Sequence, residues 1–448
     1  MSEINKKNLG DFLDTDYSQS ALYLTFRNTA NYVDGLKPGG RKIIHTVKSE
    51  KITTDLKVNR LSAKVAETTA WIHGETSLEG AIVNMAQDYI GANNIPLLKA
   101  AGTFGTRFIP SAAASRYIHT CSMPYFKNIF ITDDDPILID QNFEGQQIEP
   151  RYFIPVLPMI LINGSEGIGS GYAQKILPRD YKELMTTIKK IINGEKFTCP
   201  KPSYNGFAGK IVKGVEPNSW EIHGEAKKDL RNTVIITEIP VGISLGQYLV
   251  KLDKLVEDKK IKKYKDKSED DKFYFEITTD NELYAKNIEE IKSILGLIKK
   301  VTENFTCIDE NNKIIVFKNP EDLLKAYVEI RKSSYLLRKK CLIEKWTIDS
   351  QIALSKSIFI EKIVDGTLKI NNVPQQEIEK KLSTIKDIVK NNDSYDYLFV
   401  MPVRSFTKER IHELKENAKE AKNKVIEIKK KKEEDLWIED LANIKLWG

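Results

Sequence analysis

The chain has 448 residues, and at roughly 150 residues per domain this length predicts about three domains. Hydrophobic residues make up 41% of the sequence and charged residues 29%, a balance that excludes both a disordered tail and a membrane protein. The 69 basic residues exceed the 63 acidic residues by only 6, an excess that permits nucleic-acid binding but does not demonstrate it.

Cysteine spacing and hydropathy restrict the compartment. The 4 cysteines stand far apart and form no CxxC pair, which argues against a disulfide framework and a zinc site and fits a reducing cytosol. No stretch approaches the roughly 18 consecutive apolar residues of a membrane-spanning helix. The polar first residues lack the apolar core of a signal peptide. We therefore expect a cytoplasmic protein without a membrane partner.

The first third of the chain predicts helices that alternate with glycine-bearing loops. Apolar residues from Leu78 to Tyr89 recur at the spacing of one buried helical stripe. Thr76 or Ser77 is the expected N-cap of that helix, because hydroxyl side chains accept hydrogen bonds from the first backbone amides.

The middle third mixes helix and strand. Runs rich in β-branched residues at 159–163, 233–239 and 273–278 predict strands, since turns rich in glycine, proline and lysine separate them. Residues 181–192 predict a helix. Interleaved helices and strands of this kind are typical of α+β architecture.

The last third has the heptad pattern of two long helices. Apolar residues over 323–363 recur at alternating spacings of four and three, and they predict one long helix that ends at Gly366. A second heptad pattern covers 411–428 and follows Thr407, the expected N-cap. This arrangement predicts an antiparallel coiled-coil arm with a small globular knob at its tip.

A glycine-rich run from Asn163 to Gly171 carries one isolated apolar side chain. The run is not a dinucleotide-binding loop, because position 172 is Tyr172, and it is not a Walker loop, because no Gly-Lys-Ser/Thr follows. Its spacing alone favours a structural turn. The alternative is that Ile168 is an apolar wedge presented by a tight turn.

An Arg-Tyr pair, Arg116 and Tyr117, offers a nucleophile for phosphorus and a cation for the phosphate charge. The pair alone is weak evidence, because most such tyrosines are packing residues. An unperturbed phenol has a pKa of about 10, so Tyr117 needs a nearby base, cation or metal to react at neutral pH. His73 is the candidate hydrogen-bond donor to the phosphate.

Further motifs accompany this pair in a recognisable order. Lys37, Arg41 and Lys42 put cations near an expected helix start, an arrangement suited to phosphate contact. The segments that carry the order are Arg27 to Lys42 with Asp34-Gly35-Leu36-Lys37-Pro38, His73-Gly74-Glu75, residues 91–107, Ala112 to Tyr117, Ile162 to Gly171, and residues 395–410. Together they resemble the DNA-cleavage core of type IIA DNA topoisomerases over about residues 22–441.

Within that family the chain resembles the gyrase-A-like cleavage and rejoining subunit, and is closest to the medium subunit of a T-even-like phage topoisomerase. The resemblance implies an α+β multidomain fold with a coiled coil and a C-terminal dimerisation gate. Its parts are a winged-helix domain with the catalytic tyrosine at 1–148, an α/β tower domain with the isoleucine wedge at 149–318, and a coiled-coil arm with the C-gate at 319–448, whose knob covers about 367–405.

The resemblance also implies an activity and its residues. The chain would be part of an ATP-dependent type II DNA topoisomerase that makes and reseals a staggered double-strand break through 5′-phosphotyrosyl links, so that another duplex passes through. The residues it implicates are Tyr117 as nucleophile, Arg116 as charge stabiliser, His73 and Arg27 as assistants, Lys37, Arg41 and Lys42 as holders of the DNA backbone, and Ile168 as a wedge between base steps.

Partners and cofactors follow from the same resemblance. Mg²⁺ and ATP would both be held by a separate large subunit with Toprim and ATPase domains, and no metal ligand is expected in this chain. The chain would bind double-stranded DNA, pair with itself through the C-gate, and form a heterotetramer with the large subunit. If the protein is viral, the host cytoplasm is the expected location.

Two other functional classes compete with this interpretation. The first is a non-catalytic DNA-binding scaffold, which predicts no covalent adduct with DNA. The second is a tyrosine recombinase, which needs several dispersed arginines and a histidine before a tyrosine near the C-terminus.

The sequence departs from gyrase-like members at Trp71 and Gly40, where those members have histidines.

Overall fold

The computed structural model of the chain describes residues 8–446, which form two compact units. Unit 1 contains the residues up to Thr132, residues 138–331 and the residues from Asp440 onward, whereas unit 2 contains Asp133–Ile137 and Lys332–Glu439. Among the described residues, no helix is long and apolar enough to cross a membrane. The expected division at 148 and 318 stays a prediction, and its outermost residues, 1–7 and 447–448, lie outside the described ranges.

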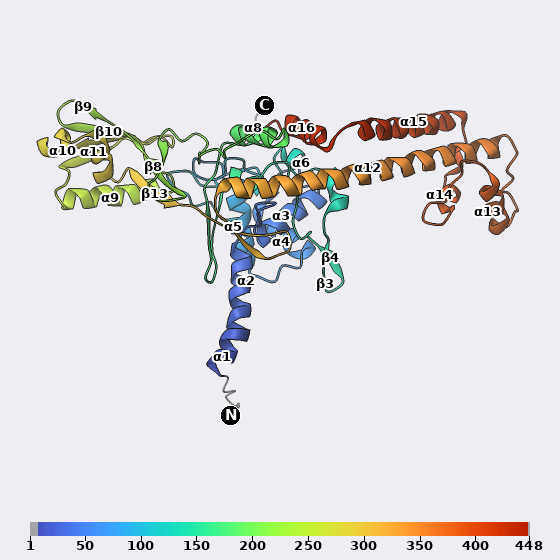
Figure 1. The fold of residues 1–448 in the computed structure, drawn as a ribbon, viewed down its shortest axis with the longest axis horizontal. Coiled ribbons are helices and arrows are strands. Elements are labelled where there is room, and N and C mark those ends of the chain that lie inside the picture. The colour runs from blue at the N-terminus through green and yellow to red at the C-terminus, as the bar shows by residue number, and fades with distance from the viewer. Residues whose placement is uncertain (1–7, 447–448) are drawn as a thin grey trace. The chain divides into compact units, whose positions relative to one another are not determined.

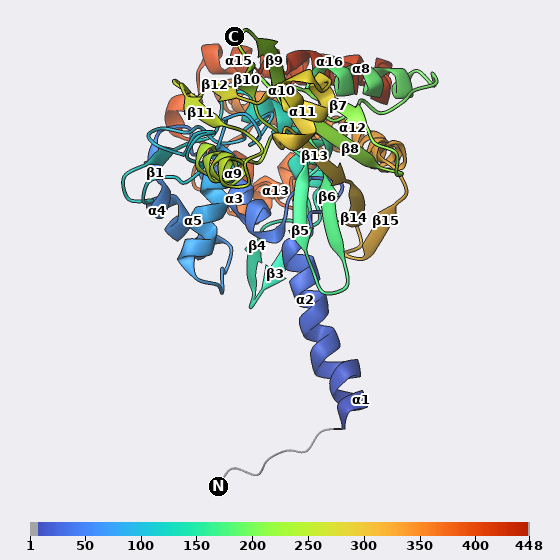
Figure 2. The ribbon, with the colours of Figure 1, turned by 90° about the vertical axis from the view of Figure 1, so that its left-hand side faces the viewer.

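The first part of unit 1 is a helical cluster. Before the cluster, one continuous helical segment consists of α1 (Leu9–Phe12), the π-helical turn η1 (Leu13–Tyr17) and α2 (Ser18–Asn28). Its N-terminal end projects away from the cluster in Figures 1 and 2. The cluster itself contains α3 (Pro38–Ser49), α4 (Val58–Thr68) and α5 (Glu75–Ala86). Their apolar faces form its core, in which Ile43, Leu61, Leu78 and Ile82 are fully buried.

Helix α5 differs from the prediction at both ends. The expected cap at Thr76 or Ser77 is wrong, because the helix begins at Glu75 after Gly74, whose carbonyl accepts a hydrogen bond from the Ser77 amide at 3.2 Å. Tyr89 lies beyond the helix, which ends before Gln87. The Gln87 side chain is buried and donates to the Phe104 carbonyl at 2.8 Å, a tertiary contact that no helical periodicity reports.

Short elements accompany the helical cluster, and all but β1 follow it in sequence. Strands β1 (Leu56–Lys57) and β2 (His119–Thr120) pair antiparallel, and so do β3 (Gln141–Phe143) and β4 (Gln146–Ile148). The short helices are α6 (Phe126–Ile129), η2 (Thr132–Ile137) and α7 (Met159–Ile162). The strand predicted at 159–163 is therefore wrong, since a short, fully apolar run fits a buried helix as well as a buried strand.

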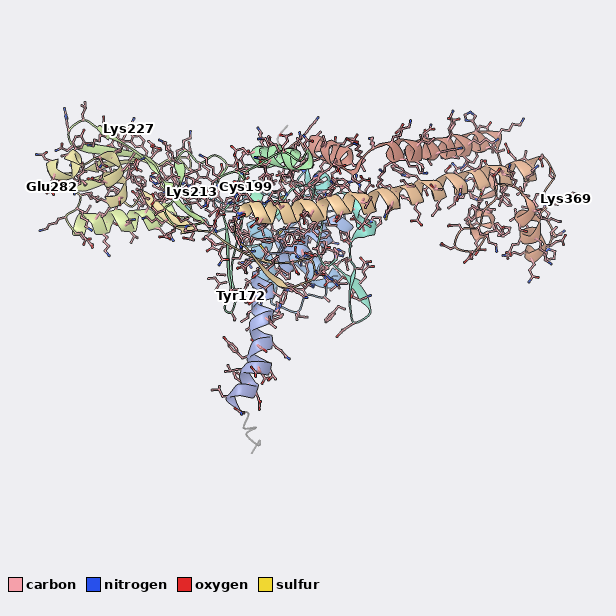
Figure 3. All side chains as sticks on the ribbon, viewed as in Figure 1. Tyr172, Cys199, Lys213, Lys227, Glu282 and Lys369 are labelled. Carbon is pink, nitrogen blue, oxygen red and sulfur yellow. The ribbon has the colours of Figure 1, made fainter. Side chains whose placement is uncertain are left out.

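A glycine-rich hairpin joins this region to the next sheet. Strands β5 (Ser165–Ile168) and β6 (Ala173–Ile176) pair antiparallel, and β14 (Asn304–Ile308) and β15 (Ile314–Phe317) extend them in the order β15-β14-β6-β5. The tip of the hairpin carries Tyr172, which is labelled in Figure 3. Helix α8 (Tyr181–Ile192) follows and confirms the predicted helix, with Asp180 as its N-cap.

Two further sheets make up the rest of unit 1. One has the order β13-β8-β7, with β7 (Lys210–Lys213), β8 (Ser219–His223) and β13 (Ile298–Thr302). The other has the order β11-β12-β10-β9, with β9 (Glu225–Asp229), β10 (Thr233–Glu238), β11 (Lys263–Asp266) and β12 (Phe275–Thr278). Helices α9 (Leu245–Glu257), α10 (Asn281–Ala285) and α11 (Ile288–Ile294) supply apolar side chains to the core of the second sheet. The strands predicted at 233–239 and 273–278 are confirmed.

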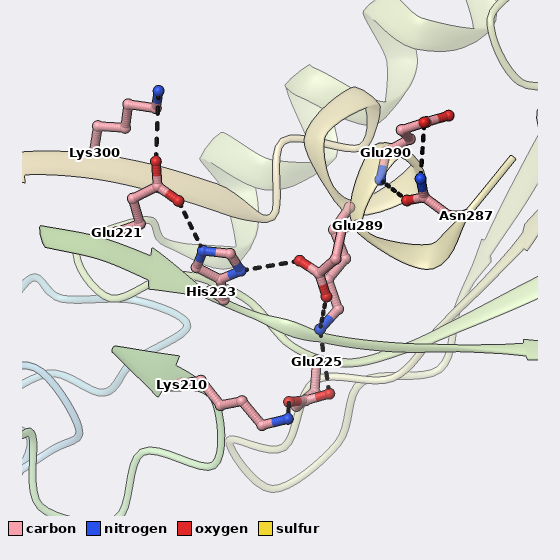
Figure 4. Close-up of polar contacts among 9 residues, drawn as sticks. Lys210, Glu221, His223, Glu225, Asn287, Glu289, Glu290 and Lys300 are labelled. Carbon is pink, nitrogen blue, oxygen red and sulfur yellow. Dashed lines mark hydrogen bonds and ion pairs between the residues drawn. The ribbon is translucent and has the colours of Figure 1, made fainter. Parts of the chain in front are cut away.

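A network of charged side chains ties β8 to helix α11 (Figure 4). His223 contacts the carboxylates of Glu221 at 3.1 Å and Glu289 at 3.2 Å. Lys292, whose side chain is 5% exposed, lies 3.6 Å from Glu289 and 3.5 Å from Glu225. The hydrogen bond from His223 and the charge of Lys300 lower the pKa of Glu221. These contacts connect two sheets through side chains rather than through strand pairing.

Unit 2 is built on two long antiparallel helices. Helix α12 (Pro320–Val364) begins in unit 1, and α15 (Lys408–Lys430) runs back along it. Two contacts show the antiparallel direction: Lys415 of α15 pairs with Glu361, and Ser350 donates to the carbonyl of Ala418, farther along α15, at 2.9 Å. Gly366 adopts a φ of +79° beyond the end of α12, as the sequence predicted. The antiparallel pairing of the two helices is confirmed.

The knob between these helices has its own core. It contains α13 (Gln375–Thr384), α14 (Asp396–Phe399) and η3 (Val403–Ser405), and it packs Leu368, Leu382 and Leu398 against Phe359 of α12. The hydroxyl of Thr407 accepts from the Arg410 amide at 3.2 Å, so the predicted N-cap of α15 is confirmed. The last helix is α16 (Glu433–Asn443).

Candidate active site

Tyr117 stands on an exposed loop whose backbone is fixed on both sides. Its amide donates to the Ala114 carbonyl at 2.9 Å, and the next residue, Ile118, is buried and accepts from the Val58 amide at 3.1 Å. The turn at residues 115–117 therefore leads from the exposed Tyr117 directly into the buried Ile118. The Tyr117 side chain is 68% exposed, which is the placement a phenol needs to meet a large substrate.

Arg116 lies beside this phenol. Its guanidinium carbon is 5.1 Å from the centre of the Tyr117 ring, a cation–π distance. The preceding residue, Ser115, donates to Glu79 of α5 at 2.7 Å and so anchors the loop to that helix. The pair predicted from the sequence is thus presented together on one face of a loop held by α4 and α5.

His73 lies in the loop that leads into α5. Its Nε2 atom forms a hydrogen bond with the hydroxyl of Tyr23 from α2, and its ring contacts Trp71 edge-on with centroids 5.0 Å apart. Burial and the positive charges of Arg27 and Lys42 lower the pKa of His73, so the neutral imidazole predominates at neutral pH.

A cavity of about 240 Å³ lies over this histidine. Rings and aliphatic groups form most of its wall, and its polar members are few. The lining includes Tyr23, Phe26, Trp71, His73, Arg27, Lys42 and, from the β3–β4 hairpin, Phe143 and Ile148. Arg27 and His73, which the sequence predicted to act together, therefore share one cavity.

A second cavity of about 460 Å³ also has Arg27 in its wall. Lys37 lines it as well, together with Glu166 of β5. The ammonium of Lys37 donates to the Glu166 carbonyl at 2.7 Å, and burial lowers the pKa of this lysine. Lys37 thus lies at an open cavity while tied to the glycine-rich hairpin.

Arg41 and Lys42 are engaged within the protein. Arg41 is 8% exposed and its Nε atom donates to Asp34 at 2.8 Å, in a pair that organises the turn before α3. Lys42 donates to the Thr69 carbonyl at 2.6 Å and to Glu149 at 2.9 Å. Contacts of these two side chains with DNA stay predictions, and the structure gives each of them an intramolecular carboxylate partner.

Ile168 ends strand β5 and its side chain is 77% exposed. The hairpin that carries it lies directly against α2: the Asn28 side-chain amide donates to the Ile168 carbonyl at 3.0 Å, and the Thr25 hydroxyl accepts from the Ser170 amide at 3.2 Å. A Cβ atom on Gly167 would lie 1.9 Å from the Asn28 carbonyl oxygen. The glycine therefore permits close approach of α2, and an apolar side chain is left in solvent.

Gly169, on the other side of Ile168, is required for the same reason. A Cβ atom on Gly169 would lie 2.6 Å from the Thr25 hydroxyl. Both close contacts come from α2, whose later turns also supply Arg27. One helix thus positions the exposed isoleucine and a cation of the two cavities.

Tyr23, Thr25 and Asn28 have no motif of their own, and sequence reasoning missed them. A signal was present: Tyr23 precedes Arg27 by four residues, so a helix puts both on one face. Neither Arg116 nor Tyr117 belongs to the lining of the two cavities. Helix α5 connects the two groups, because His73 precedes its start and Glu79 holds the Tyr117 loop.

The arrangement offers an exposed phenol beside a guanidinium, a neutral imidazole, and cations around open cavities. Such a set can attack, neutralise and hold a phosphodiester. Within residues 8–446, no group of three or more His, Cys, Asp or Glu side chains is placed to hold a metal ion.

Comparisons with known proteins bear on this chemistry. Residues 27–442 match the family described as the A subunit of DNA gyrase/topoisomerase IV. The mitochondrial DNA topoisomerase 2 of Dictyostelium discoideum is 32% identical over 453 residues, which cover 97% of this chain and 35% of that protein. The DNA topoisomerase 2 of Plasmodium falciparum is 33% identical over 97% of this chain and 34% of that protein. This chain therefore spans about a third of the length of these relatives.

A solved structure has the same fold. The crystal structure of the Plasmodium falciparum topoisomerase II DNA-binding, cleavage and re-ligation domain superposes with a TM-score of 0.89 at 33% identity. The likeness covers 97% of this chain and 63% of that one. It confirms the mixed helix and sheet architecture predicted from the sequence.

Proposed function

Because the chain belongs to the family of DNA gyrase and topoisomerase IV A subunits, we propose that it is the DNA-cleaving and rejoining subunit of an ATP-dependent type II DNA topoisomerase. Two copies make and reseal a staggered double-strand break, one strand each, and allow another duplex to pass, which relaxes or decatenates DNA. The observation that carries this proposal is the exposed phenol of Tyr117 beside the Arg116 guanidinium.

The proposed chemistry is an exchange of phosphodiester bonds. The Tyr117 oxygen loses its proton and bonds to phosphorus, the bond to the 3′ oxygen breaks, and that oxygen gains a proton. The products are a 5′-phosphotyrosyl link and a free 3′-hydroxyl, so resealing needs no energy donor. Arg116 stabilises the charge that develops on the phosphate, and neutral His73 and Arg27 supply hydrogen bonds to it.

DNA is held and bent by residues around the two cavities. Lys37 contacts the flanking backbone, and Arg41 and Lys42 belong to the same cationic segment. Ile168, which is 77% exposed, enters between base steps and bends the duplex. The support for this role is that a large apolar side chain stands in solvent on a hairpin fixed to α2.

Partners complete the proposed enzyme. We propose that a separate large subunit supplies Toprim and ATPase domains, binds ATP and supplies the carboxylates that hold Mg²⁺, which assists departure of the 3′ oxygen when bound. The chain pairs with itself through the knob and forms a heterotetramer with the large subunit. In this proposal the chain is a T-even-like phage medium subunit that works on viral DNA in the host cytoplasm.

The test is the substitution Tyr117→Phe, which removes only the phenolic oxygen. The variant is incubated with supercoiled plasmid, Mg²⁺ and the Toprim-bearing partner, and the mixture is denatured. We expect no protein-linked linear DNA, while DNA binding persists. Tyr17→Phe, which changes another exposed phenol of unit 1, serves as the matched control and is expected to keep full adduct formation. Adducts that remain in Tyr117→Phe would contradict the proposal and indicate another nucleophile. If the native chain itself forms no adduct, the result would favour the non-catalytic DNA-binding scaffold.

A further inference from the structure

We propose that Tyr23 is a positioning residue that holds His73 in the tautomer whose proton is on Nδ1, so that Nδ1–H is the donor available to DNA phosphate. The inference rests on the proposed function, because it assigns His73 a role toward the scissile phosphate. It concerns a residue for which the sequence carries no motif, and which lies on α2 rather than on the loop of His73.

The geometry begins with one hydrogen bond. The Tyr23 hydroxyl meets Nε2 of His73, and the two rings lie 5.9 Å apart between centroids. Among the described residues, no side chain or backbone group is bonded to Nδ1 of this ring. A neutral imidazole has one donor and one acceptor nitrogen, and the partner of one nitrogen decides which form is present. If the phenol donates to Nε2, the ring proton is on Nδ1.

The surroundings favour a neutral ring. Tyr23 and Arg27 face His73 from α2, Lys42 faces it from α3, and the β3–β4 hairpin contributes the uncharged Phe143 and Ile148. The charges of Arg27 and Lys42 disfavour imidazolium, and the Glu149 carboxylate is paired with Lys42. A tautomer can matter for phosphate contact only when the imidazole is neutral, and this environment meets that condition.

The orientation of the ring is fixed from two sides. Trp71 packs edge-on against His73, and the Tyr23 hydroxyl reaches the ring from helix α2. Helix α2 is also bonded to the hairpin of Ile168 through Asn28. Tyr23 therefore connects the histidine to the element that positions the wedge.

The first experiment observes the tautomer directly in the full-length chain. The protein contains 5 histidines, so nitrogen-15 labelling of histidine gives few side-chain signals, and His73→Gln identifies the signal of interest by its loss. In the native chain we expect a protonated Nδ1 and an unprotonated Nε2 at neutral pH. In Tyr23→Phe, which keeps the ring and its packing, we expect the other tautomer to appear and the pKa of His73 to rise, because a hydrogen bond to the neutral form is lost.

The control is the same substitution on the same continuous helix. Tyr17→Phe changes a phenol that is 52% exposed, six residues before Tyr23, and it should leave the His73 signal unchanged. A native His73 that carries its proton on Nε2 would overturn the proposal. So would a Tyr23→Phe spectrum with an unaltered tautomer and an unaltered titration.

The second experiment measures covalent adducts at Tyr117 as a function of pH, with plasmid, Mg²⁺ and the Toprim-bearing partner. For Tyr23→Phe we expect a loss of about tenfold above the pKa of His73, of the size that one hydrogen bond supplies, with unchanged DNA affinity. Below that pKa both ring nitrogens are protonated, so the difference from the native chain should narrow. A purely structural role of Tyr23 predicts a loss that does not depend on pH, and that result would also contradict the proposal.

Failure of the two ideas can be told apart. If the native chain forms no adduct, the proposed function fails, whereas the nitrogen-15 spectra still report whether Tyr23 sets the tautomer. If the native chain forms adducts and the spectra of Tyr23→Phe match those of the native chain, the proposed function stands and the positioning role of Tyr23 is wrong.

Discussion

The exposure of Tyr117 and the charge of His73 are set by the residues around them. Tyr117 faces solvent on a turn that leads into the buried Ile118 and that Ser115 ties to Glu79. His73 is neutral because burial disfavours its charged form and because Arg27 and Lys42 raise the local positive potential. Each proposed chemical role belongs to one side chain, so a single substitution can test that role.

Arg116→Ala should reduce DNA cleavage on the order of a hundredfold or more, because it removes one preorganised charge stabiliser beside the nucleophile. The measurement is the rate of covalent adduct formation at saturating DNA. Arg404→Ala removes the same charge from an exposed position in the knob and is the control. Equal losses in both variants would mean that net charge, and not the position beside Tyr117, sets the rate.

Secondary-structure elements carry the next level of organisation, and α2 connects several of them. It contacts the β5–β6 hairpin through Thr25 and Asn28, lines both cavities through Arg27, and reaches His73 through Tyr23. Figure 2 shows α2 beside β5 and β6. Functional parts far apart in the sequence are therefore fixed to one helix.

Ile168→Ala should weaken DNA bending and cleavage and leave thermal melting nearly unchanged, since a side chain that is 77% exposed contributes little to the core. Bending is measured by fluorescence transfer between the ends of a labelled duplex. Leu230→Ala truncates a side chain that is 80% exposed elsewhere in unit 1 and should change neither bending nor melting. A large drop in melting temperature with normal bending would assign Ile168 to packing instead.

The network around His223 predicts a dependence of stability on pH. The pKa of Glu221 is lowered in the folded chain, so its stabilising contribution is complete above its unfolded-state pKa of about 4.3 and is lost as pH falls through the folded-state value. Glu221→Gln should therefore melt at a lower temperature than the native chain at neutral pH. The difference should vanish in acid, and a difference that stays constant down to low pH would refute the electrostatic account.

On the scale of the whole molecule, the protein presents an exposed phenol beside a guanidinium and cations around two cavities. Within residues 8–446, no group of three or more His, Cys, Asp or Glu side chains is placed to hold a metal ion. The family comparison covers nearly all of this chain but about a third of its relatives' length. Our proposal assigns the binding of ATP and Mg²⁺ to a separate large subunit.

We predict that the purified chain is a dimer that binds DNA with an affinity that falls steeply as salt rises, because phosphate contacts release counterions. It should not relax supercoiled plasmid alone, even with Mg²⁺ and ATP. Light scattering, binding titrations at several salt concentrations and plasmid gels give the readouts. Relaxation by this chain alone, with no change when the large subunit is added, would contradict the split enzyme.

The dimer contact can be tested separately. Val400 in the knob is 78% exposed, and Val400→Asp should shift the chain toward monomer if the knob joins two copies. Val250→Asp makes the same change at a 70% exposed position on α9 and should leave the dimer intact.

Local patterns in the sequence were sufficient for several features of the molecule. Heptad spacing predicted α12 and α15 and their antiparallel pairing, turn chemistry predicted the Thr407 cap and the glycine after α12, and the order of motifs identified the family. The caps and each single motif lie within a few residues, whereas the heptad patterns and the order of the motifs extend along the chain. All of them depend on positions in the sequence alone, so no tertiary information was needed.

Long-range packing accounts for the features that the sequence left open. The run 159–162 is a helix and not the predicted strand. The sequence could not decide between the two, because a short apolar stretch fits a buried helix and a buried strand equally well. Arg41 and Lys42 bind Asp34 and Glu149 within the protein, and Tyr23 meets His73 across 50 positions of sequence. Charge and residue type indicate that a side chain can bind a phosphate, but which partner it meets is settled only when distant segments pack together.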